Sequence, residues 1–105
     1  MDVDGRRLVS VPYSSETNDF GALLRWGMTP DEVDQLIRRQ FDTLWREGAE
    51  SGRVMAISLH PFLIGYPHRI GALASALEYI LGHDGIWLTT GSEIMDHYLA
   101  SDAAI

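Results

Sequence analysis

A nearly unbroken apolar run at residues 54–59, with helical periodicity on both sides of it, constrains the fold of this chain more than any other feature. The run ends at His60-Pro61. A strand that is covered on both faces has this continuous apolar character, because neither face meets water. Strands that alternate with helices are typical of a parallel sheet. We therefore expect a strand at residues 54–59 within an α/β fold.

The helix before this run has a clear start and a clear buried face. Thr29 can cap the first turn, Pro30 suits the first helical position, and Glu32 can close a capping box. Gly48 or Gly52 is expected to end the helix. The apolar positions at spacings of three and four are Val33, Leu36, Ile37, Phe41, Leu44 and Trp45. The residues expected to face away are Asp34, Arg38, Arg39 and Arg46.

The second half of the chain repeats the alternation. A helix beginning near His68 and closed by Gly82 is expected to bury one face, formed by Ile70, Leu73, Ala74, Leu77 and Ile80. A short strand at residues 85–89 precedes a helix that opens with the capping pattern Thr90-Gly91-Ser92-Glu93 and runs to Leu99. With a first strand at residues 7–13 and an ambiguous segment at 20–28, the order is β-α-β-α-β-α in one domain, residues 1–105. Three strands do not close a barrel, so an open sheet edge is expected.

Composition excludes several kinds of partner and site. The net charge is −7, with eight Arg, no Lys and no basic run, so the chain lacks the clustered cations that nucleic acid requires. The absence of cysteine excludes disulfides, thiolate metal sites and a Cys nucleophile. The first residues lack a signal-peptide pattern, and no apolar run approaches the ~20 residues that cross a bilayer. We expect a cytoplasmic protein without a membrane partner.

His60 is the first candidate for chemistry. It directly ends the buried strand, and functional groups in parallel α/β folds gather at the C-terminal ends of strands. An imidazole also titrates in a range suited to proton transfer near neutral pH. The alternative is a structural histidine whose ring bonds a neighbouring loop.

The remaining candidates are polar residues near strand ends and helix starts. Glu16, Asn18 and Asp19 could offer acceptors and an amide to a polar substrate, but such clusters also build turns. Arg69, at the start of the second long helix, could pair with a carboxylate or simply lie on the surface. The other histidines, including His83 and His97, are expected to be solvated. Because the four histidines show no HxH or HExxH spacing, no metal site is predicted within this chain.

Three stretches together carry a family likeness. They are residues 11–19 (VPYSSETND), 57–69 (ISLHPFLIGYPHR) and 87–94 (WLTTGSEI). In order and spacing they resemble the C-terminal portion of the polysaccharide deacetylase family, closest to its allantoinase-like and amidase-like branch. The resemblance spans nearly the whole chain.

The resemblance implies a fold, a reaction and a set of roles. The fold would be the second half of an irregular (β/α)7 barrel. The reaction would be metal-dependent hydrolysis of non-peptide C–N bonds, in which a divalent metal (Zn or similar) activates water and a histidine protonates the leaving amine. His60 matches that histidine, and the loop from Tyr13 through Glu16 and Asn18 to Asp19 would line the substrate pocket, with Arg69 as a further contact. The substrate would be a small-molecule amide or an acetylated sugar.

One departure from the family is as informative as the likeness. Nothing in this chain corresponds to the aspartate pair and paired histidines that hold the family's metal in the first half of the barrel. A complementary N-terminal half, in the same polypeptide or another, would then supply the metal and the catalytic base. The alternative is a non-catalytic domain that forms an oligomer through its open sheet edge.

Overall fold

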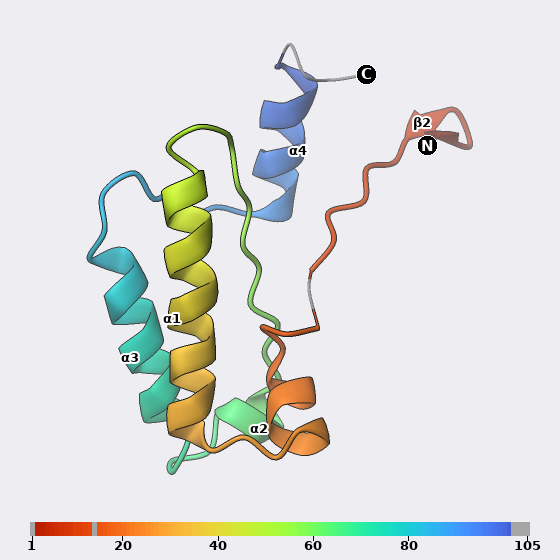
Figure 1. The fold of residues 1–105 in the computed structure, drawn as a ribbon. Helices are drawn as coiled ribbons and strands as arrows, with labels where there is room; N and C mark the ends of the chain where they lie inside the picture. The colour runs from red at the N-terminus through yellow and green to blue at the C-terminus, as the bar shows by residue number, and fades with distance from the viewer. Residues whose placement is uncertain (1, 14, 102–105) are drawn as a thin grey trace. The chain divides into compact units, whose positions relative to one another are not determined.

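The computed structural model describes residues 2–13 and 15–101, and the chain divides into two compact units. The larger unit is Tyr13–Ile86, and the other contains the described residues on either side of it. The helical elements of the larger unit are the π-helical turn η1 (Phe20–Arg25), α1 (Pro30–Glu47), α2 (Pro61–Ile64) and α3 (Ile70–Leu81). The elements of the other unit are β1 (Asp2–Val3), β2 (Arg6–Arg7) and α4 (Gly91–Leu99). Figure 1 shows them along the chain.

The predicted start and end of the first long helix are confirmed. Thr29 Oγ1 accepts a hydrogen bond from Glu32 N at 3.2 Å, and Glu32 Oε1 accepts one from Thr29 N at 3.0 Å, so the capping box is complete. These bonds to Thr29 lower the pKa of the Glu32 carboxyl below its ordinary value. Pro30 takes the first helical position and Gly48 follows the last turn.

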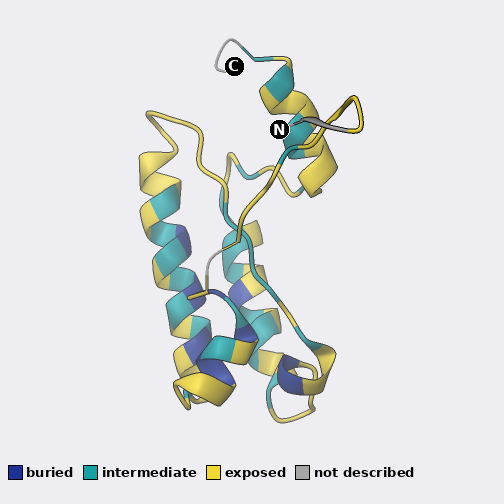
Figure 2. Ribbon diagram, turned by 90° about the vertical axis from the view of Figure 1, so that its right-hand side faces the viewer, coloured by how far each residue is buried: buried dark blue, intermediate teal, exposed yellow. Residues whose placement is uncertain are grey.

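The core of the larger unit lies where α1 packs against α3 and η1. Figure 1 shows α1 and α3 side by side, and Figure 2 shows that most buried positions of this unit belong to helices. Burial of each large aliphatic side chain contributes roughly 1.5–3 kcal/mol, which makes this cluster the main source of stability. Its buried members are Ala22, Leu23, Val33, Ile37, Leu63, Ile64 and Ala76.

The predicted inner face of α3 requires a correction. Leu73 and Ile80 pack against the core as expected, and Ala76 is fully buried among them. The residues predicted to be inside that the structure leaves exposed are Ile70, Ala74 and Leu77. Almost every position of this helix is apolar, so periodicity alone could not fix which stripe faces α1.

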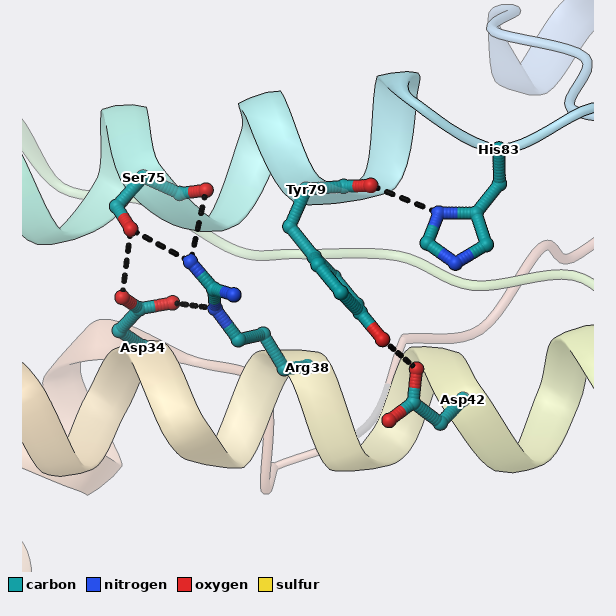
Figure 3. A network of polar contacts seen from close by, with 6 residues as sticks. All are labelled: Asp34, Arg38, Asp42, Ser75, Tyr79 and His83. Atoms are coloured by element: carbon teal, nitrogen blue, oxygen red, sulfur yellow. Dashed lines mark hydrogen bonds and ion pairs between the residues drawn. The ribbon is translucent and has the colours of Figure 1, made fainter.

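Polar contacts between α1 and α3 correct a second prediction. Asp34 and Arg38 were expected to face away, but both bind Ser75 on α3 (Figure 3). Arg38 Nη2 lies 2.7 Å from Ser75 Oγ, and the Ser75 hydroxyl donates to Asp34 Oδ2 at 2.8 Å. The ion pair between Arg38 Nε and Asp34 Oδ1, at 2.7 Å, closes the cluster. Long polar side chains at the border of a buried face can therefore join two helices rather than meet only water.

The sequence predicted that His83 would be solvated, but the structure shows its ring in contact with other side chains. Its Nδ1 lies 2.8 Å from the backbone oxygen of Tyr79, and its ring packs edge-on against Phe41, Trp45 and Tyr79, with centroids 4.8–5.2 Å apart. The Tyr79 hydroxyl donates to Asp42 on α1 (Figure 3). This hydrogen bond to Asp42 raises the pKa of Tyr79 above its ordinary value. His97, by contrast, is exposed as predicted and packs edge-on against Trp87.

The predicted parallel strands are not formed as ladders. Residues 8–13, 54–59 and 85–89 belong to no strand of the described backbone. The ladder that does form is antiparallel and joins β1 to β2. Asp4 and Gly5 connect these strands with φ values of 50° and 75°, a geometry that suits a tight hairpin and favours Asp-Gly.

Residues 54–59 keep one parallel contact, the bridge between Asn18 and Ser58. A strand needs a neighbour along its whole length to exchange hydrogen bonds, and the described residues supply one only near its end. The order β-α-β-α-β-α is therefore not confirmed, and the described residues form a helix-rich segment with extended connections.

The last helix is confirmed at both ends. Thr90 Oγ1 accepts from Glu93 N at 3.2 Å, and α4 ends at Leu99. None of the described helices combines the length and the apolar character that crossing a membrane requires.

The capping box at α1 predicts the effect of Thr29→Ala. The substitution should lower the free energy of unfolding by about 1 kcal/mol, because the N–H of Glu32 loses its acceptor. Urea unfolding monitored by circular dichroism measures the change. Thr43→Ala, at an exposed position within the same helix, is the matched control and should have little effect; an equal loss in both variants would contradict the capping role.

The bond between Tyr79 and Asp42 predicts a pH-dependent effect of Tyr79→Phe. Because the folded state favours the protonated phenol, this bond stabilises the fold below the ordinary tyrosine pKa of about 10 and the gain is lost as pH rises through the raised pKa. The stability difference between the wild type and Tyr79→Phe should therefore be largest near pH 7 and shrink above pH ~10. Urea unfolding at several pH values tests this, with exposed Tyr13→Phe as the control. A difference that does not change with pH would be the contrary result.

Candidate functional site around His60 and Asp19

Two segments far apart in the sequence meet at the end of residues 54–59. Asp19 N donates to Ser58 O at 3.1 Å, and Ser58 N donates to Thr17 O at 2.9 Å. The Thr17 hydroxyl adds a bond to Ala56 O at 2.7 Å. Thr17 and Asp19 are both buried, each with 3% of its surface exposed. The loop predicted to line a substrate pocket is thus tied by its backbone to the segment that ends at His60.

The Asp19 carboxylate organises the turn that begins at His60. Its Oδ2 accepts from the backbone N–H of His60 at 2.7 Å and from that of Ile64 at 3.4 Å. Its Oδ1 lies 2.7 Å from His60 Nδ1. The Asp19 side chain is 1% exposed, so its charge is compensated by these donors rather than by water.

This contact fixes how the imidazole can act. A carboxylate beside Nδ1 favours the tautomer with a proton on Nδ1, because that nitrogen then donates. The other ring nitrogen, Nε2, remains available for a reaction. The His60 side chain is 39% exposed, enough for an incoming group to reach it. A histidine bonded to a buried aspartate in this way is a common arrangement for acid–base catalysis.

The alternation of side chains explains why His60 can be reached. Met55 and Ile57 pack against the helical core of the unit. In an extended chain, successive side chains point to opposite sides, and His60 has extended dihedrals, φ −124° and ψ 118°. In this alternation His60 falls in phase with Ser58 and out of phase with Met55 and Ile57.

Two aromatic rings flank the imidazole, and the sequence did not single them out. The ring centroids of Phe20 and Phe62 lie 5.9 and 5.6 Å from that of His60. Both side chains are largely exposed, at 44% and 55%. Their positions directly after Asp19 and two residues after His60 are the signal that could have found them.

The other residues predicted to contact substrate do not share the surroundings of His60. Asn18 Oδ1 accepts from Phe20 N at 2.9 Å, which is the turn-building role that the sequence left open. Glu16 is exposed in the same loop. Tyr13 is 65% exposed and has no described contact with His60.

Arg69 stabilises the segment that follows His60. Its Nη1 donates to Leu63 O at 3.1 Å, and its guanidinium lies 5.9 Å from the centre of the Tyr66 ring. The bond ties the start of α3 to the carbonyl end of the short helix α2. Contact with substrate remains a prediction for Arg69, as it does for Tyr13, Glu16, Asn18 and Asp19.

The described residues do not assemble a metal site. No group of three or more His, Asp or Glu side chains within residues 2–13 and 15–101 is placed to hold an ion. The pair of Asp19 and His60 supplies at most two ligands, whereas zinc sites use about three or four.

Comparison with known proteins identifies the relatives. No family model matches the sequence. A Schizosaccharomyces pombe protein named "Putative polysaccharide deacetylase" is 33% identical over 99 residues, which cover 92% of this chain and 31% of that protein. The resemblance to the polysaccharide deacetylase family is confirmed.

Solved structures of an allantoinase and of a probable polysaccharide deacetylase are also similar to this chain. The crystal structure of Puue allantoinase matches with a TM-score of 0.83 and 32% identity, over 90% of this chain and 32% of the other. A protein of Pseudomonas aeruginosa PAO1, titled "probable Polysaccharide deacetylase", matches with a TM-score of 0.82 and 31% identity, over 89% and 31%. Similarity at this level is consistent with the predicted α/β fold class. The chain spans about a third of the length of each relative.

The contacts of Asp19 predict the effect of Asp19→Asn. An amide of the same size cannot accept hydrogen bonds at both positions, so one donor of His60 loses its partner and the free energy of unfolding should fall by about 1–3 kcal/mol. The His60 ring should also change from one tautomer to a mixture, which ¹⁵N NMR of the imidazole nitrogens detects. Glu16→Gln, an exposed carboxylate in the same loop, is the control. An unchanged His60 tautomer in Asp19→Asn would contradict the positioning role.

Proposed function

We propose that this chain supplies the acid–base residue of a hydrolase that cleaves non-peptide C–N bonds. The observation that carries the proposal is the pair of Asp19, buried, and His60, partly exposed, joined at 2.7 Å. Such a pair holds one nitrogen of the imidazole and leaves the other free. The similarity to deacetylase-like and allantoinase proteins supports a hydrolytic reaction rather than another use of the same pair.

His60 would act as a general acid through Nε2. Hydrolysis of an amide adds water to the carbonyl carbon and breaks the C–N bond, and the departing nitrogen needs a proton to leave as a neutral amine. Protonated His60 would donate that proton from Nε2, while Asp19 keeps Nδ1–H in place throughout. After the transfer the ring is neutral, with its lone pair on Nε2, ready to take a proton back from water.

The rest of the active site would come from outside the described residues. This chain covers about a third of its relatives, and its described residues hold no cluster of metal ligands. We include in the proposal a complementary N-terminal part that provides a divalent metal, zinc or similar, and the base. Tyr13, Glu16, Asn18 and Arg69 would contribute substrate contacts from this chain.

The names of the relatives define the substrates to test. One class is an acetylated sugar, as a polysaccharide deacetylase name implies, and the other is allantoin or a similar small amide. An uncharged or cationic small molecule suits a chain with a net charge of −7 better than nucleic acid does. A role in carbohydrate metabolism and a cytoplasmic location both stay predictions.

A chimera tests the proposal while providing the missing part. This chain would replace the matching third of Puue allantoinase and, separately, that of the Schizosaccharomyces pombe relative. Hydrolysis of allantoin and of an acetylated oligosaccharide would be assayed. His60→Ala should lower kcat by about 10²–10⁴-fold, the usual contribution of general acid–base catalysis.

His97→Ala is the control variant, because His97 is exposed on α4 and packs only against Trp87 among its described ring contacts. It should keep the activity of the unsubstituted chimera. Full activity in the His60→Ala chimera would remove the proposed role of His60. A folded chimera that hydrolyses neither substrate would count against the hydrolase proposal itself.

A further inference from the structure

Two exposed phenylalanines converge on the imidazole of His60 from segments far apart in the sequence. The ring centroids of Phe20 and Phe62 lie 5.9 and 5.6 Å from that of His60, with interplanar angles of 54° and 72°. Both phenyl side chains are largely exposed. Single exposed apolar residues are common, but two that meet at one partly exposed histidine mark a binding surface.

The local backbone holds both phenylalanines in place. Phe20 follows the buried Asp19, and its N–H donates to Asn18 Oδ1 at 2.9 Å. Phe62 lies in α2, which is tied to the same Asp19 through the N–H of Ile64 at 3.4 Å. The residue that orients the imidazole thus also anchors the segments that carry both rings. A surface that is formed before a ligand arrives lowers the entropic cost of binding.

The proposed role of His60 determines which part of a substrate meets these rings. A general acid must come within about 2.6–3.2 Å of the atom that it protonates, which here is the leaving nitrogen of the amide. Every ring atom of an imidazole lies about 1 Å from the ring centre, so Nε2 is within about 7 Å of both phenyl centres. Carbon atoms attached to the leaving nitrogen are therefore within reach of Phe20 and Phe62.

The two rings suit an apolar group better than a polar one. A phenyl side chain has no polar atom, so it binds a ligand through its apolar face and edge. Among the described contacts of the His60 side chain, the polar partner is Asp19, whose buried carboxylate is already occupied by its donors. A polar leaving group would lose hydrogen bonds to water here without gaining others from these residues.

We propose that Phe20 and Phe62 form a subsite for the leaving amine, selective for an amide whose nitrogen carries a carbon ring with C–H faces. The inference rests on the proposed function and adds the part of the substrate that determines specificity. An N-acetylated amino sugar meets this requirement, because C–H groups of the sugar ring adjoin the amide nitrogen. Allantoin meets it poorly, since carbonyl groups adjoin the nitrogens of its ring. Of the two substrate classes proposed for this chain, the subsite favours the acetylated sugar.

Binding to the chain alone tests the subsite without hydrolysis. The probe is N-cyclohexylacetamide, an uncharged amide with a carbon ring on its nitrogen, and the matched probe is N-methylacetamide, which lacks the ring. The chain has three phenylalanines, and Phe41 is only 5% exposed, so it serves as an internal control. In NMR spectra of ¹³C-labelled phenylalanine, the signals of Phe20 and Phe62 should shift with N-cyclohexylacetamide, while that of Phe41 stays unchanged. N-methylacetamide at equal concentration should shift none of them.

Single substitutions test whether the rings themselves are needed. Phe20→Ala and Phe62→Ala should each weaken the binding of N-cyclohexylacetamide at least about fivefold, measured from the imidazole signals of His60. Phe20→Tyr and Phe62→Tyr keep the ring and should retain binding. The control is Trp87→Ala, because Trp87 is 55% exposed, as Phe62 is, and its described ring contact is with His97. Circular dichroism of each variant checks that the helices persist.

The chimera of this chain with Puue allantoinase tests which side of the amide the rings select. Its substrates are N-cyclohexylacetamide and the isomer N-methylcyclohexanecarboxamide, which carries the same carbon ring on the acyl side. The unsubstituted chimera should favour the first substrate in kcat/KM at least about tenfold. Phe62→Ala should remove most of this preference, and Trp87→Ala should keep it.

The contrary outcomes separate this subsite from the role of His60. Unshifted Phe20 and Phe62 signals, equal shifts with both probes, or equal losses of binding in Trp87→Ala and Phe62→Ala would each overturn the subsite. So would a chimera that hydrolyses both isomers equally or keeps its preference in Phe62→Ala. Loss of activity in His60→Ala together with an unchanged preference in Phe62→Ala overturns the subsite alone. Full activity in His60→Ala overturns the proposed function instead.

Discussion

The buried carboxylate of Asp19 is the interaction on which the described site depends. It accepts from the backbone of His60 and Ile64 and from the His60 ring, so one side chain joins a loop to a turn 41 residues later. A buried carboxylate without such donors would be strongly unfavourable, so the loop and the turn stabilise each other. Precise placement of the imidazole is therefore a consequence of satisfying a buried charge.

The two long helices provide the rigid support for this site. Their apolar contacts exclude water, while Asp34, Arg38 and Ser75 link the helices at the edge of the core. The extended residues 54–59 pack on this support through Met55 and Ile57. A chain that covers only a third of its relatives can thus keep one functional pair in place.

Several features follow from local sequence because their causes are local. The capping box at Thr29, the side-chain cap at Thr90 and the end of a helix at Gly48 depend on residues within a turn of one another. The position of His60 at the end of an apolar run, and the family likeness, were equally visible in the sequence. The strands could not be judged in this way, because a strand forms only when another segment supplies its hydrogen bonds.

What the sequence determined by itself was therefore the three longer helices α1, α3 and α4, the caps that begin α1 and α4, and the prominence of His60. Only the tertiary structure decided that Asp19 pairs with His60, that Phe20 and Phe62 flank the ring, and which stripe of α3 stays exposed. The physical reason is distance along the chain. Contacts within a turn are fixed by backbone geometry, whereas a contact between residues 19 and 60 or between two helices depends on how the whole core packs.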